Sequence, residues 1–413
     1  MPLTSTPEEL HAWIRLSLEP DLGPAQARSL LAAIGLPQDI YALPAAALAK
    51  YVPGELARQL QRPPSSDIQI RIDHTLEWLE QPGHHVLTLA DPEYPPALLD
   101  TYDPPLLLFA HGNKKLLSNP CLGIVGARSA TAGGLDNARA FARHLSTHGW
   151  SIVSGLALGI DTAAHEGALQ AGSEGGSTIA VLGTGIDIVY PARNRSLAHQ
   201  IAEHGLLITE LPLGTRALPY QFPKRNRLVA GLCQGILVVE AARQSGSLIT
   251  ARLAGELGRE VFAIPGSIHS PLARGCHALI RQGAKLVESA DDIHDELRQP
   301  KQGSLLAENS RRSRKQRPAQ TIAGHTRPDS DTNRAPTPPD SAGANHSKAD
   351  HTLQGEHDPD TAAVLQALGY DPVHPDILLQ RTGLDMARLT SILLQLELTQ
   401  LVHRHTNGCY QRQ

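Results

Sequence analysis

The sequence predicts an α/β protein built around a doubly wound parallel sheet, with a small helical domain before it and another small domain after it. Between about residues 119 and 290, short apolar runs alternate with segments long enough to form helices. Continuous apolar strands separated by helices are typical of a parallel sheet covered on both faces. The chain of 413 residues also exceeds one typical hydrophobic core, so roughly two to three domains are expected. The predicted strands are Cys121–Val125, Ser151–Val153, Thr178–Leu182, Leu206–Thr209, Ile236–Val239, Val261–Ile264 and Lys285–Val287.

The first 80 residues are predicted to be helical. Pro7–Ser17 follows Thr6, a good helix cap, and Pro24–Ile34 begins with proline at a first-turn position and stops at Gly35. Gly23 before the second helix is weakly consistent with a helix-hairpin-helix, which would hold a DNA phosphate on helix-end amides. A purely structural helical cap explains the same pattern equally well.

A polar segment follows the sheet domain. From Ala307 to Thr352 the only large apolar residue is Ile322, so this stretch cannot bury enough surface to offset its ordering entropy. We therefore predict domains at 1–80, 81–298 and 358–413, with 299–357 as a disordered linker. A basic run in the linker either touches nucleic acid or is a solvated charge run, and composition favours the second. It consists of Arg311, Arg312, Arg314, Lys315 and Arg317.

The last domain reads as a winged helix. Three predicted helices, Asp360–Gly369, Pro375–Gly383 and Asp385–Leu396, precede a hairpin whose turn is Asn407-Gly408. The third helix offers Arg388 but little other positive charge, which argues against base readout by this domain.

Composition excludes several classes of protein. A formal charge of −4 rules out a globally basic nucleic-acid coat, so any anion site must be local. No apolar run approaches the roughly 18–20 residues that span a bilayer, and the N-terminus has no signal-peptide pattern. The four cysteines form no CxxC pair and suggest neither a zinc site nor a disulfide framework. We expect a soluble cytoplasmic protein that does not contact membranes.

Glycine-rich and hydroxyl-rich loops follow four of the predicted strands. Glycines let the backbone approach a ligand, helix-start amides attract anions, and an arginine can grip a phosphate with two donors. Because the carboxyl ends of parallel strands share one edge of the sheet, these loops predict a polyanion site there. Its candidate residues are Gly126, Arg128, Ser129, Ser154, Gly155, Gly159, Gly183, Arg193, Asn194, Ser245, Gly246 and Ser247.

A basic stretch with aromatic residues supplies the second half of the predicted site. No acidic residue occurs from Leu211 to Val239, and arginines alternate with Tyr220 and Phe222. Positive groups that track phosphates beside aromatic faces that stack on bases are typical of single-strand binding. A buried Phe222 inside a structural loop is the alternative. The further candidates for DNA contact are Phe222, Lys224, Arg225, Asn226 and Arg227.

Signatures of common enzymes are missing from the sequence. It has no GxxxxGK[ST] loop, no complete GxGxxG after a strand and no HExxH, so we expect no nucleotide cofactor, no metal and no catalytic residue. His144 and His148, spaced i,i+4, could bind a metal, but an exposed or capping role is favoured. Asp161 and His165 could form an acid–base pair, but a helix-start carboxylate that orients a histidine is favoured.

Eight segments resemble the DNA-processing protein A (DprA/Smf) family of bacteria. They run in order from about residue 91 to 287 and are DPEYPPALLDTYDPPLLLFAHGN, GIVGARSAT, VSGLALGIDTAAHEGAL, VLGTGIDIVYPARN, FPKRNRLVAGL, VVEAARQSGSLITA, VFAIPGS and GCHALIRQGAKLV. The resemblance implies an extended Rossmann-like domain, a SAM-like or helix-hairpin-helix-like N-terminal domain and a C-terminal winged helix.

The resemblance also implies a function. It predicts a non-enzymatic mediator that binds and protects incoming single-stranded DNA, forms a homodimer and loads RecA during natural transformation. It puts Arg128 on the family's pocket arginine and FPKRNR on its second DNA-contacting strip. Ala192, Pro219 and Gln400 depart from the family's common lysine, lysine and turn glycine.

Two other classes of function remain open from the sequence. The fold also resembles Rossmann-like phosphoribohydrolases, but these use a Pro-Gly-Gly loop where this chain has QSGSLITA. The third class is a scaffold protein that interacts with RecA and contacts DNA only indirectly.

Overall fold

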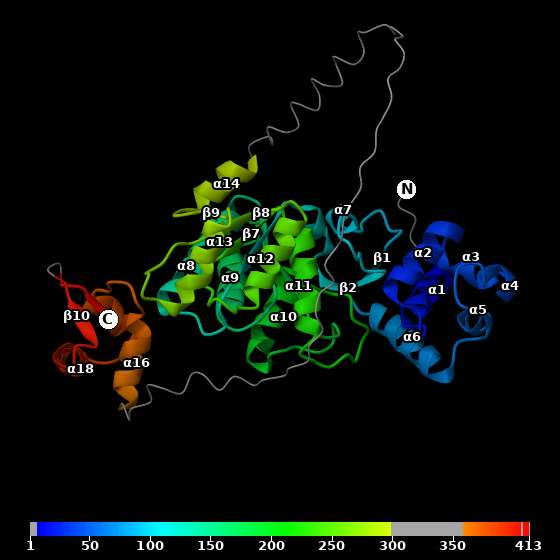
Figure 1. Cartoon of the computed structure of the whole chain (residues 1–413). Helices are drawn as coiled ribbons and strands as arrows, with labels where there is room; N and C mark the ends of the chain where they lie inside the picture. The colour runs from blue at the N-terminus through cyan, green and yellow to red at the C-terminus, as the bar shows by residue number, and fades with distance from the viewer. Residues whose placement is uncertain (1–5, 299–357, 406–407, 413) are drawn as a thin grey trace, which may run out of the picture.

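The computed structural model describes residues 6–298, 358–405 and 408–412; the predicted linker and Asn407 lie outside them. Its centre is one nine-stranded sheet with the order β1-β2-β6-β5-β4-β3-β7-β8-β9 (Figure 1). Strands β3 to β9 are parallel and coincide with the seven predicted runs, so the predicted α/β class is confirmed. They span Cys121–Val125, Ser151–Ser154, Thr178–Val181, Leu206–Thr209, Gly235–Val238, Glu260–Ala263 and Lys285–Leu286.

Two antiparallel strands at one edge extend the predicted parallel sheet. β1 (His84–Thr88) pairs with β2 (Leu107–Gly112), and β2 pairs with β6 through partners such as Phe109 and Thr209. Between β1 and β2 the chain forms the short helix α7 (Pro96–Leu99). These strands join the N-terminal helices to the sheet.

Helices cover both faces of the sheet. α8 and α9 pack on one face, around Leu122 and Ile152, whereas α11 and α12 pack on the other, around Val238. These helices and the remaining ones of the domain are α8 (Ala132–Thr147), α9 (Ile160–Leu169), α10 (Arg195–His204), α11 (Gln221–Leu232), α12 (Ser247–Glu256), α13 (Arg274–Arg281) and α14 (Ala290–Arg298), with 3-10 turns at Lys114–Ser118, Ala192–Asn194 and Pro271–Ala273.

The strand order changes direction between β3 and β7. The chain runs outward through β4, β5 and β6, returns to the far side of β3 and then continues outward through β8 and β9. In open α/β sheets such a switch leaves a crevice beyond the strands' carboxyl ends, because the neighbouring loops diverge there.

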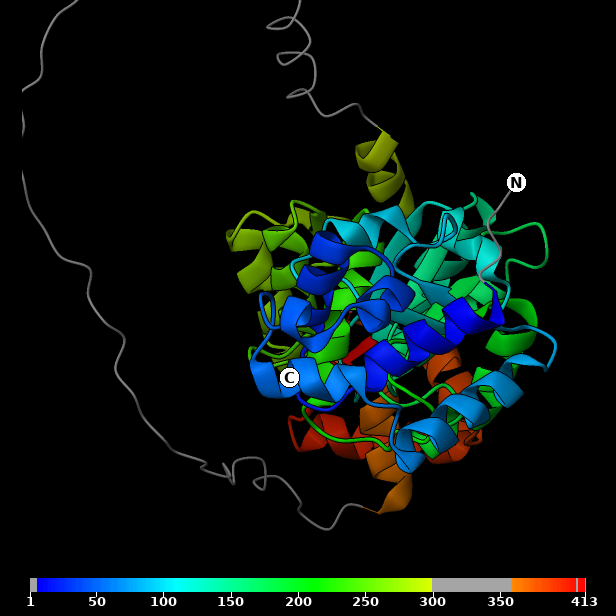
Figure 2. The ribbon, with the colours of Figure 1, turned by 90° about the vertical axis from the view of Figure 1, so that its right-hand side faces the viewer.

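The N-terminal helices lie at one end of the sheet and the winged helix lies beyond the other end (Figures 1 and 2). The Thr6 side chain accepts from the Glu9 amide and the Glu9 carboxylate accepts from the Thr6 amide, which completes a capping box. The Arg15 Nε lies 2.9 Å from Glu19 Oε1 at the end of α1, and the same guanidinium donates to the Leu60 and Arg62 carbonyls at the end of α5, which joins the two helices. The N-terminal helices are α1 (Pro7–Leu18), α2 (Pro24–Ile34), α3 (Pro37–Ala42), α4 (Ala45–Leu48), α5 (Gly54–Gln61) and α6 (Ser66–Leu79).

The C-terminal domain has three helices and a hairpin with a core of their own. That core includes Val364, Leu378, Ile392 and Val402, and the winged-helix prediction is confirmed. Gln400, where a turn glycine is common in the family, has a φ of 58°, so the chain keeps the left-handed turn without the glycine. The elements are α16 (Pro359–Leu368), α17 (Pro375–Thr382), α18 (Met386–Leu398), β10 (Val402–Arg404) and β11 (Tyr410–Arg412). No helix in the described ranges is long and apolar enough to span a bilayer.

Candidate nucleic-acid interface

A groove of 710 Å³ opens at the switch between β3 and β7. Its walls are the loops that follow β3, β4 and β7, together with the start of α11 and Tyr190 of the loop that follows β5. The structure therefore brings all four predicted loops to one place, although the loop after β5 contributes only Tyr190 to the lining. The predicted residues in its lining are Gly126, Arg128, Ser129, Gly155, Phe222, Arg225, Asn226, Ser245, Gly246 and Ser247.

Arg128 lies exposed in the β3–α8 loop at this groove. Within the described residues its guanidinium has neither a hydrogen bond nor an ion pair. The loop itself is fixed, because the Ala127 amide donates to the Glu240 carbonyl at 2.7 Å and the Ala127 carbonyl accepts from the Ile160 amide. A Cβ on Gly126 would lie 2.6 Å from Ile160 Cγ1, so only glycine fits there. The result is a rigid loop that presents one free arginine.

A carboxylate of the protein already occupies the N-terminus of α8. Glu240 accepts from the Thr131 amide at 2.9 Å and from the Thr131 hydroxyl at 2.6 Å. Thr131 in turn caps α8 by accepting from the Gly134 amide. The predicted helix-start anion site is therefore filled by Glu240 at α8, and Arg128 is the nearby donor that stays available.

Gly155 in the β4–α9 loop is held from both sides by buried charges. The Asp161 carboxylate accepts from the Gly155 and Ala157 amides at 3.1 and 3.3 Å. The Arg225 guanidinium donates to the Gly155 carbonyl at 2.6 Å and also to the Val181 carbonyl. Arg225 is only 7% exposed, and burial lowers its pKa to about 10, which still leaves it charged at neutral pH. Burial likewise raises the pKa of Asp161, an effect that the Arg225 charge opposes.

Asn194 also fixes the β4–α9 loop through hydrogen bonds inside the protein. Its side-chain amide donates to the Leu156 carbonyl and the Thr162 hydroxyl, both at 2.9 Å, and it is 5% exposed. The neighbouring Arg193 is exposed and has no partner among the described residues. Ser154 is buried and donates to the Ile124 carbonyl, so its hydroxyl faces the sheet rather than the groove. Gly159, with a φ of 76°, packs on the Ala127 and Arg128 carbonyls.

Two aromatic side chains line the groove beside the basic helix α11. The rings of Tyr190 and Phe222 have centroids 5.4 Å apart, and Phe222 packs against Gly183, where a Cβ would lie 2.8 Å from the ring. Half of Tyr190 is exposed. The pair offers a face on which a base can stack.

The basic residues of α11 divide into exposed and internally paired ones. Lys224 is exposed, with its Nζ 3.9 Å from Glu210. Arg227 binds both the Glu210 carboxylate and the Asp103 carbonyl. Glu210 and Asp103 lie outside the stretch without acids, so the composition of that stretch does not reveal these pairs. The structure thus assigns internal partners to Arg225, Arg227 and Asn194, three residues that the sequence predicts as DNA contacts.

The β7–α12 loop completes the groove. Ser245 and Ser247 share a hydrogen bond of 2.7 Å between their hydroxyls, and the Gly246 carbonyl accepts from Asn226. Arg243 is exposed in this loop, without a partner in the described part of the chain, and it borders the neighbouring hollow beside α12 and α13 rather than the groove. Tyr190 does line the groove and is absent from the predicted site residues, although it lies within the family segment VLGTGIDIVYPARN.

The structure shows the partners of the two titratable pairs noted in the sequence. His165 Nδ1 lies 2.7 Å from the Thr178 hydroxyl rather than on Asp161, and burial lowers the pKa of His165 to about 3. His144 stacks on His148 and contacts Asp291, as an exposed role implies. Among the described residues no cluster of His, Cys, Asp or Glu could hold a metal ion.

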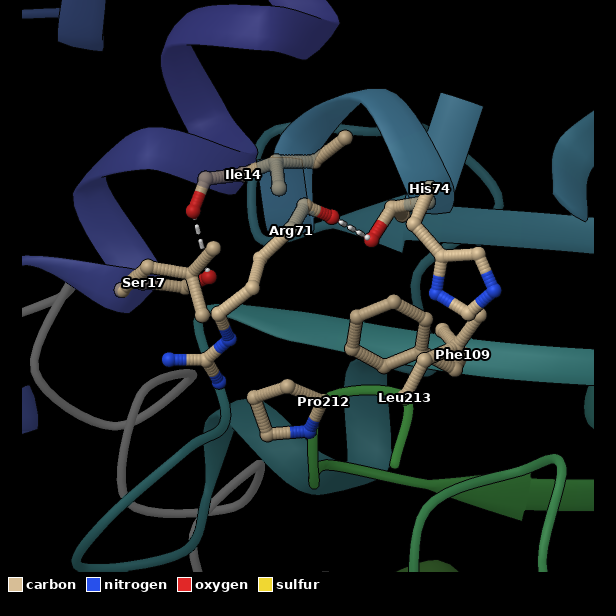
Figure 3. A pocket seen from close by; sticks show the side chains of 9 residues that line it. Ile14, Ser17, Arg71, His74, Phe109, Pro212 and Leu213 are labelled. Atoms are coloured by element: carbon tan, nitrogen blue, oxygen red, sulfur yellow. Dashed lines mark hydrogen bonds between the residues drawn. The ribbon is translucent and has the colours of Figure 1, made fainter. Parts of the chain in front are cut away.

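A smaller hollow lies between the N-terminal helices and the β6–α11 loop (Figure 3). Arg71, Ser17 and Pro212 border it, and Phe109 forms part of its wall. Its volume of 20 Å³ is about what one water molecule requires. It is too small for a nucleotide. Among the hollows formed by the described residues, the groove at the sheet switch gathers most of the predicted site residues, and it is therefore the candidate site.

Comparison with known families decides which family the chain belongs to. The family described as "DNA recombination-mediator protein A" matches residues 85–298, and "DprA winged helix domain" matches residues 335–408. The chain belongs to the DprA/Smf family. The first match covers every residue that lines the groove.

Individual relatives agree with this assignment to the DprA/Smf family. "Protein Smf" of Escherichia coli is 47% identical over 227 residues, which are 55% of this chain and 60% of that protein. "DNA processing protein DprA" of Streptococcus pneumoniae is 48% identical over 50% of this chain and 72% of its own length. "Protein Smf" of Synechocystis is 35% identical over 82% of each chain. The X-ray structure of DprA from Streptococcus pneumoniae superposes with a TM-score of 0.56 at 37% identity, over 71% of this chain and 99% of that one.

Proposed function

We propose that this DprA/Smf chain binds single-stranded DNA in the groove at the sheet switch. The observation that carries the proposal is the free guanidinium of Arg128 on a rigid loop of this groove, beside the Tyr190–Phe222 pair. A phosphate binds to Arg128 and Ser129, and a base stacks on the aromatic pair. Lys224 and Arg193 contact neighbouring phosphates, whereas Arg225, Arg227 and Asn194 hold the loops in position.

The wider role follows from the family. A DNA-recombination mediator that holds a single strand protects it and presents it to a recombinase of the RecA type, here during uptake of DNA in natural transformation. The names of the relatives, DNA processing protein DprA among them, support this role. The homodimer and the RecA contact are parts of the same proposal. Analytical sedimentation tests the homodimer, and a RecA-loading assay on coated DNA tests the RecA contact.

Binding through phosphates and stacked bases predicts a characteristic dependence on salt and strandedness. We expect log K for oligo-dT to fall linearly with log[salt], with a slope of about −0.7 for each phosphate neutralised. Single-stranded DNA should also bind more tightly than duplex, because stacking needs exposed base faces. Fluorescence anisotropy with labelled oligo-dT and its duplex at several salt concentrations measures both. An affinity that does not change with salt concentration contradicts the proposal, and so does equal affinity for single-stranded and duplex DNA.

We expect no catalytic turnover from this site. The strongest candidate base, Asp161, already accepts from two backbone amides and lies beside the buried Arg225 guanidinium. The test is to incubate the protein with nucleotides, nucleoside monophosphates and labelled DNA, with and without Mg²⁺. The molar amount of product should not exceed the molar amount of protein. Turnover beyond stoichiometry that disappears in Asp161→Asn would favour the phosphoribohydrolase alternative.

A further inference from the structure

The winged helix rests on the start of α8, next to the groove. Arg381 on α17 places its Nη2 2.8 Å from the Asp136 Oδ2 on α8. The same guanidinium donates through Nη1 to the Ala367 carbonyl at 2.9 Å, which fixes the side chain within its own domain. Helix α16 contacts α8 directly (Figure 1). One ion pair therefore connects the last domain to the helix that follows the Arg128 loop.

The turn between α16 and α17 meets the first turn of α8. A Cβ on Gly369 would lie 3.6 Å from the Thr131 Cβ, and a Cβ on Gly133 would lie 3.9 Å from the Asp371 carboxylate. Tyr370 and Asp371 border a small hollow together with Thr131 and Glu240. The docked winged helix thus brings a second carboxylate, Asp371, close to the one that already caps α8.

This docking contact is polar and is separable from the folding of either domain. The winged helix has a complete core of its own, and no residue of that core belongs to the apolar clusters around the sheet. Arg381 and Asp136 are both accessible to solvent, at 21% and 58% of their side chains. An exposed ion pair adds little stability, so the docked and released states are close in free energy. Small changes in charge or ligand can then shift the population.

The β3–α8 loop separates the groove from the docking contact by a single residue. Arg128 and Ser129 line the groove, and Thr131 borders the hollow under the winged helix. A strand that leaves the groove past Ser129 meets the 369–371 turn and the Asp371 carboxylate, which repels phosphate. We propose that the docked winged helix closes this end of the groove, so that docking competes with binding of a single strand longer than the groove.

The inference rests on the proposed function, because it concerns the path of DNA beyond the same groove. Competition is reciprocal: if docking weakens long-strand binding, long strands must release the winged helix to the same extent. The affinity for a short strand that stays within the groove does not depend on docking. Strand length therefore separates this inference from the function on which it rests.

The first experiment compares Arg381→Ala with the wild-type full chain. We expect Arg381→Ala to bind a long oligo-dT about two- to five-fold more tightly and a short one of about six nucleotides equally well. The sign is diagnostic, because removing a positive charge would otherwise weaken binding to DNA. Arg388→Ala is the matched control: Arg388 is also a winged-helix arginine, but it pairs with Asp358 and Asp360 of its own domain. It should show no gain for either length.

A second experiment locks the contact. In a Cys409→Ser background, Asp136→Cys and Arg381→Cys are joined by a short bismaleimide, which is selective because the other three cysteines are buried. The locked chain should lose affinity for the long strand and keep its affinity for the short one, and long oligo-dT should slow the cross-linking.

Each outcome has a definite meaning for the docking proposal. Failure of the two cysteines to cross-link, or equal long-strand affinity for locked and unlocked chains, overturns the competition. So does a loss of long-strand affinity in Arg381→Ala. Failure of the short strand to bind any form contradicts the proposed function instead.

Discussion

Replacing Arg128 with alanine is expected to weaken binding of short oligo-dT by about ten-fold or more without lowering the melting temperature. A charge-assisted hydrogen bond to phosphate contributes roughly 1.5–3 kcal/mol, and 1.4 kcal/mol corresponds to a factor of about ten in affinity. Within the described residues the guanidinium has no partner in the unbound chain, so its removal breaks no contact that supports the fold. Anisotropy titration measures the affinity and thermal denaturation measures the stability.

Two comparison variants separate the Arg128 contact from loss of charge alone. Arg128→Lys keeps the charge but loses the paired donors, so an intermediate affinity is expected. Arg71→Ala removes an exposed arginine from α6, beside the small hollow at the N-terminal helices, and should leave the short-strand affinity nearly unchanged. If the folded Arg128→Ala chain binds oligo-dT as tightly as the wild type, the groove is not the DNA site proposed here.

The parallel sheet could be predicted because each of its strands carries a local signal. Runs such as Cys121–Val125 are apolar throughout, as expected of strands buried on both faces. The two antiparallel strands differ in this respect. β1 is an edge strand that begins with His84 and His85 and is only partly buried over its first residues, so it lacks a continuous apolar pattern. β2 is an inner strand whose apolar residues Leu107–Ala110 are buried, so its local signal was present although the prediction did not include it.

The groove was predictable as a set of loops but not as a set of contacts. Position after a strand is visible in the sequence, so Arg128 and the serine loop at 245–247 could be placed at one edge of the sheet. The partner of a charged residue is set by folding. Arg227 reaches Glu210 and Asp103, which stand 17 and 124 residues away in the chain. A stretch without acids therefore does not predict unpaired arginines.

The same limit applies to the N-terminus of α8. A glycine-rich loop before a helix normally predicts an anion site. Glu240, which is 109 residues beyond Thr131, supplies the anion from within the protein. The sequence contains Glu240 in the VVEAAR segment, but only the pairing of β3 with β7 brings it to the helix start. Because Glu240 fills this helix start, the proposed DNA site depends on side chains, and on Arg128 first among them.

Arg225→Met is expected to destabilise the central domain by about 3–5 kcal/mol, the range for breaking a buried charge network. The variant leaves the buried Asp161 carboxylate without its neighbouring positive charge. It also removes the donors to the Gly155 and Val181 carbonyls. For a domain of this size the melting temperature should fall by roughly 10 °C. Chemical denaturation with an unchanged m-value provides the free energy.

Lys224→Ala, one residue earlier on α11, is the matched control for Arg225→Met, because Lys224 is exposed and holds only a long contact to Glu210. We expect it to lower the affinity for oligo-dT several-fold while the stability stays the same. The double variant Asp161→Asn/Arg225→Met removes both buried charges and should recover part of the lost stability, because no unpaired carboxylate remains. If Arg225→Met instead lost DNA affinity at full stability, Arg225 would be a direct phosphate contact, as the sequence alone suggests. The two arginine roles are therefore distinguished by where the free energy is lost: Arg128 in binding, Arg225 in folding.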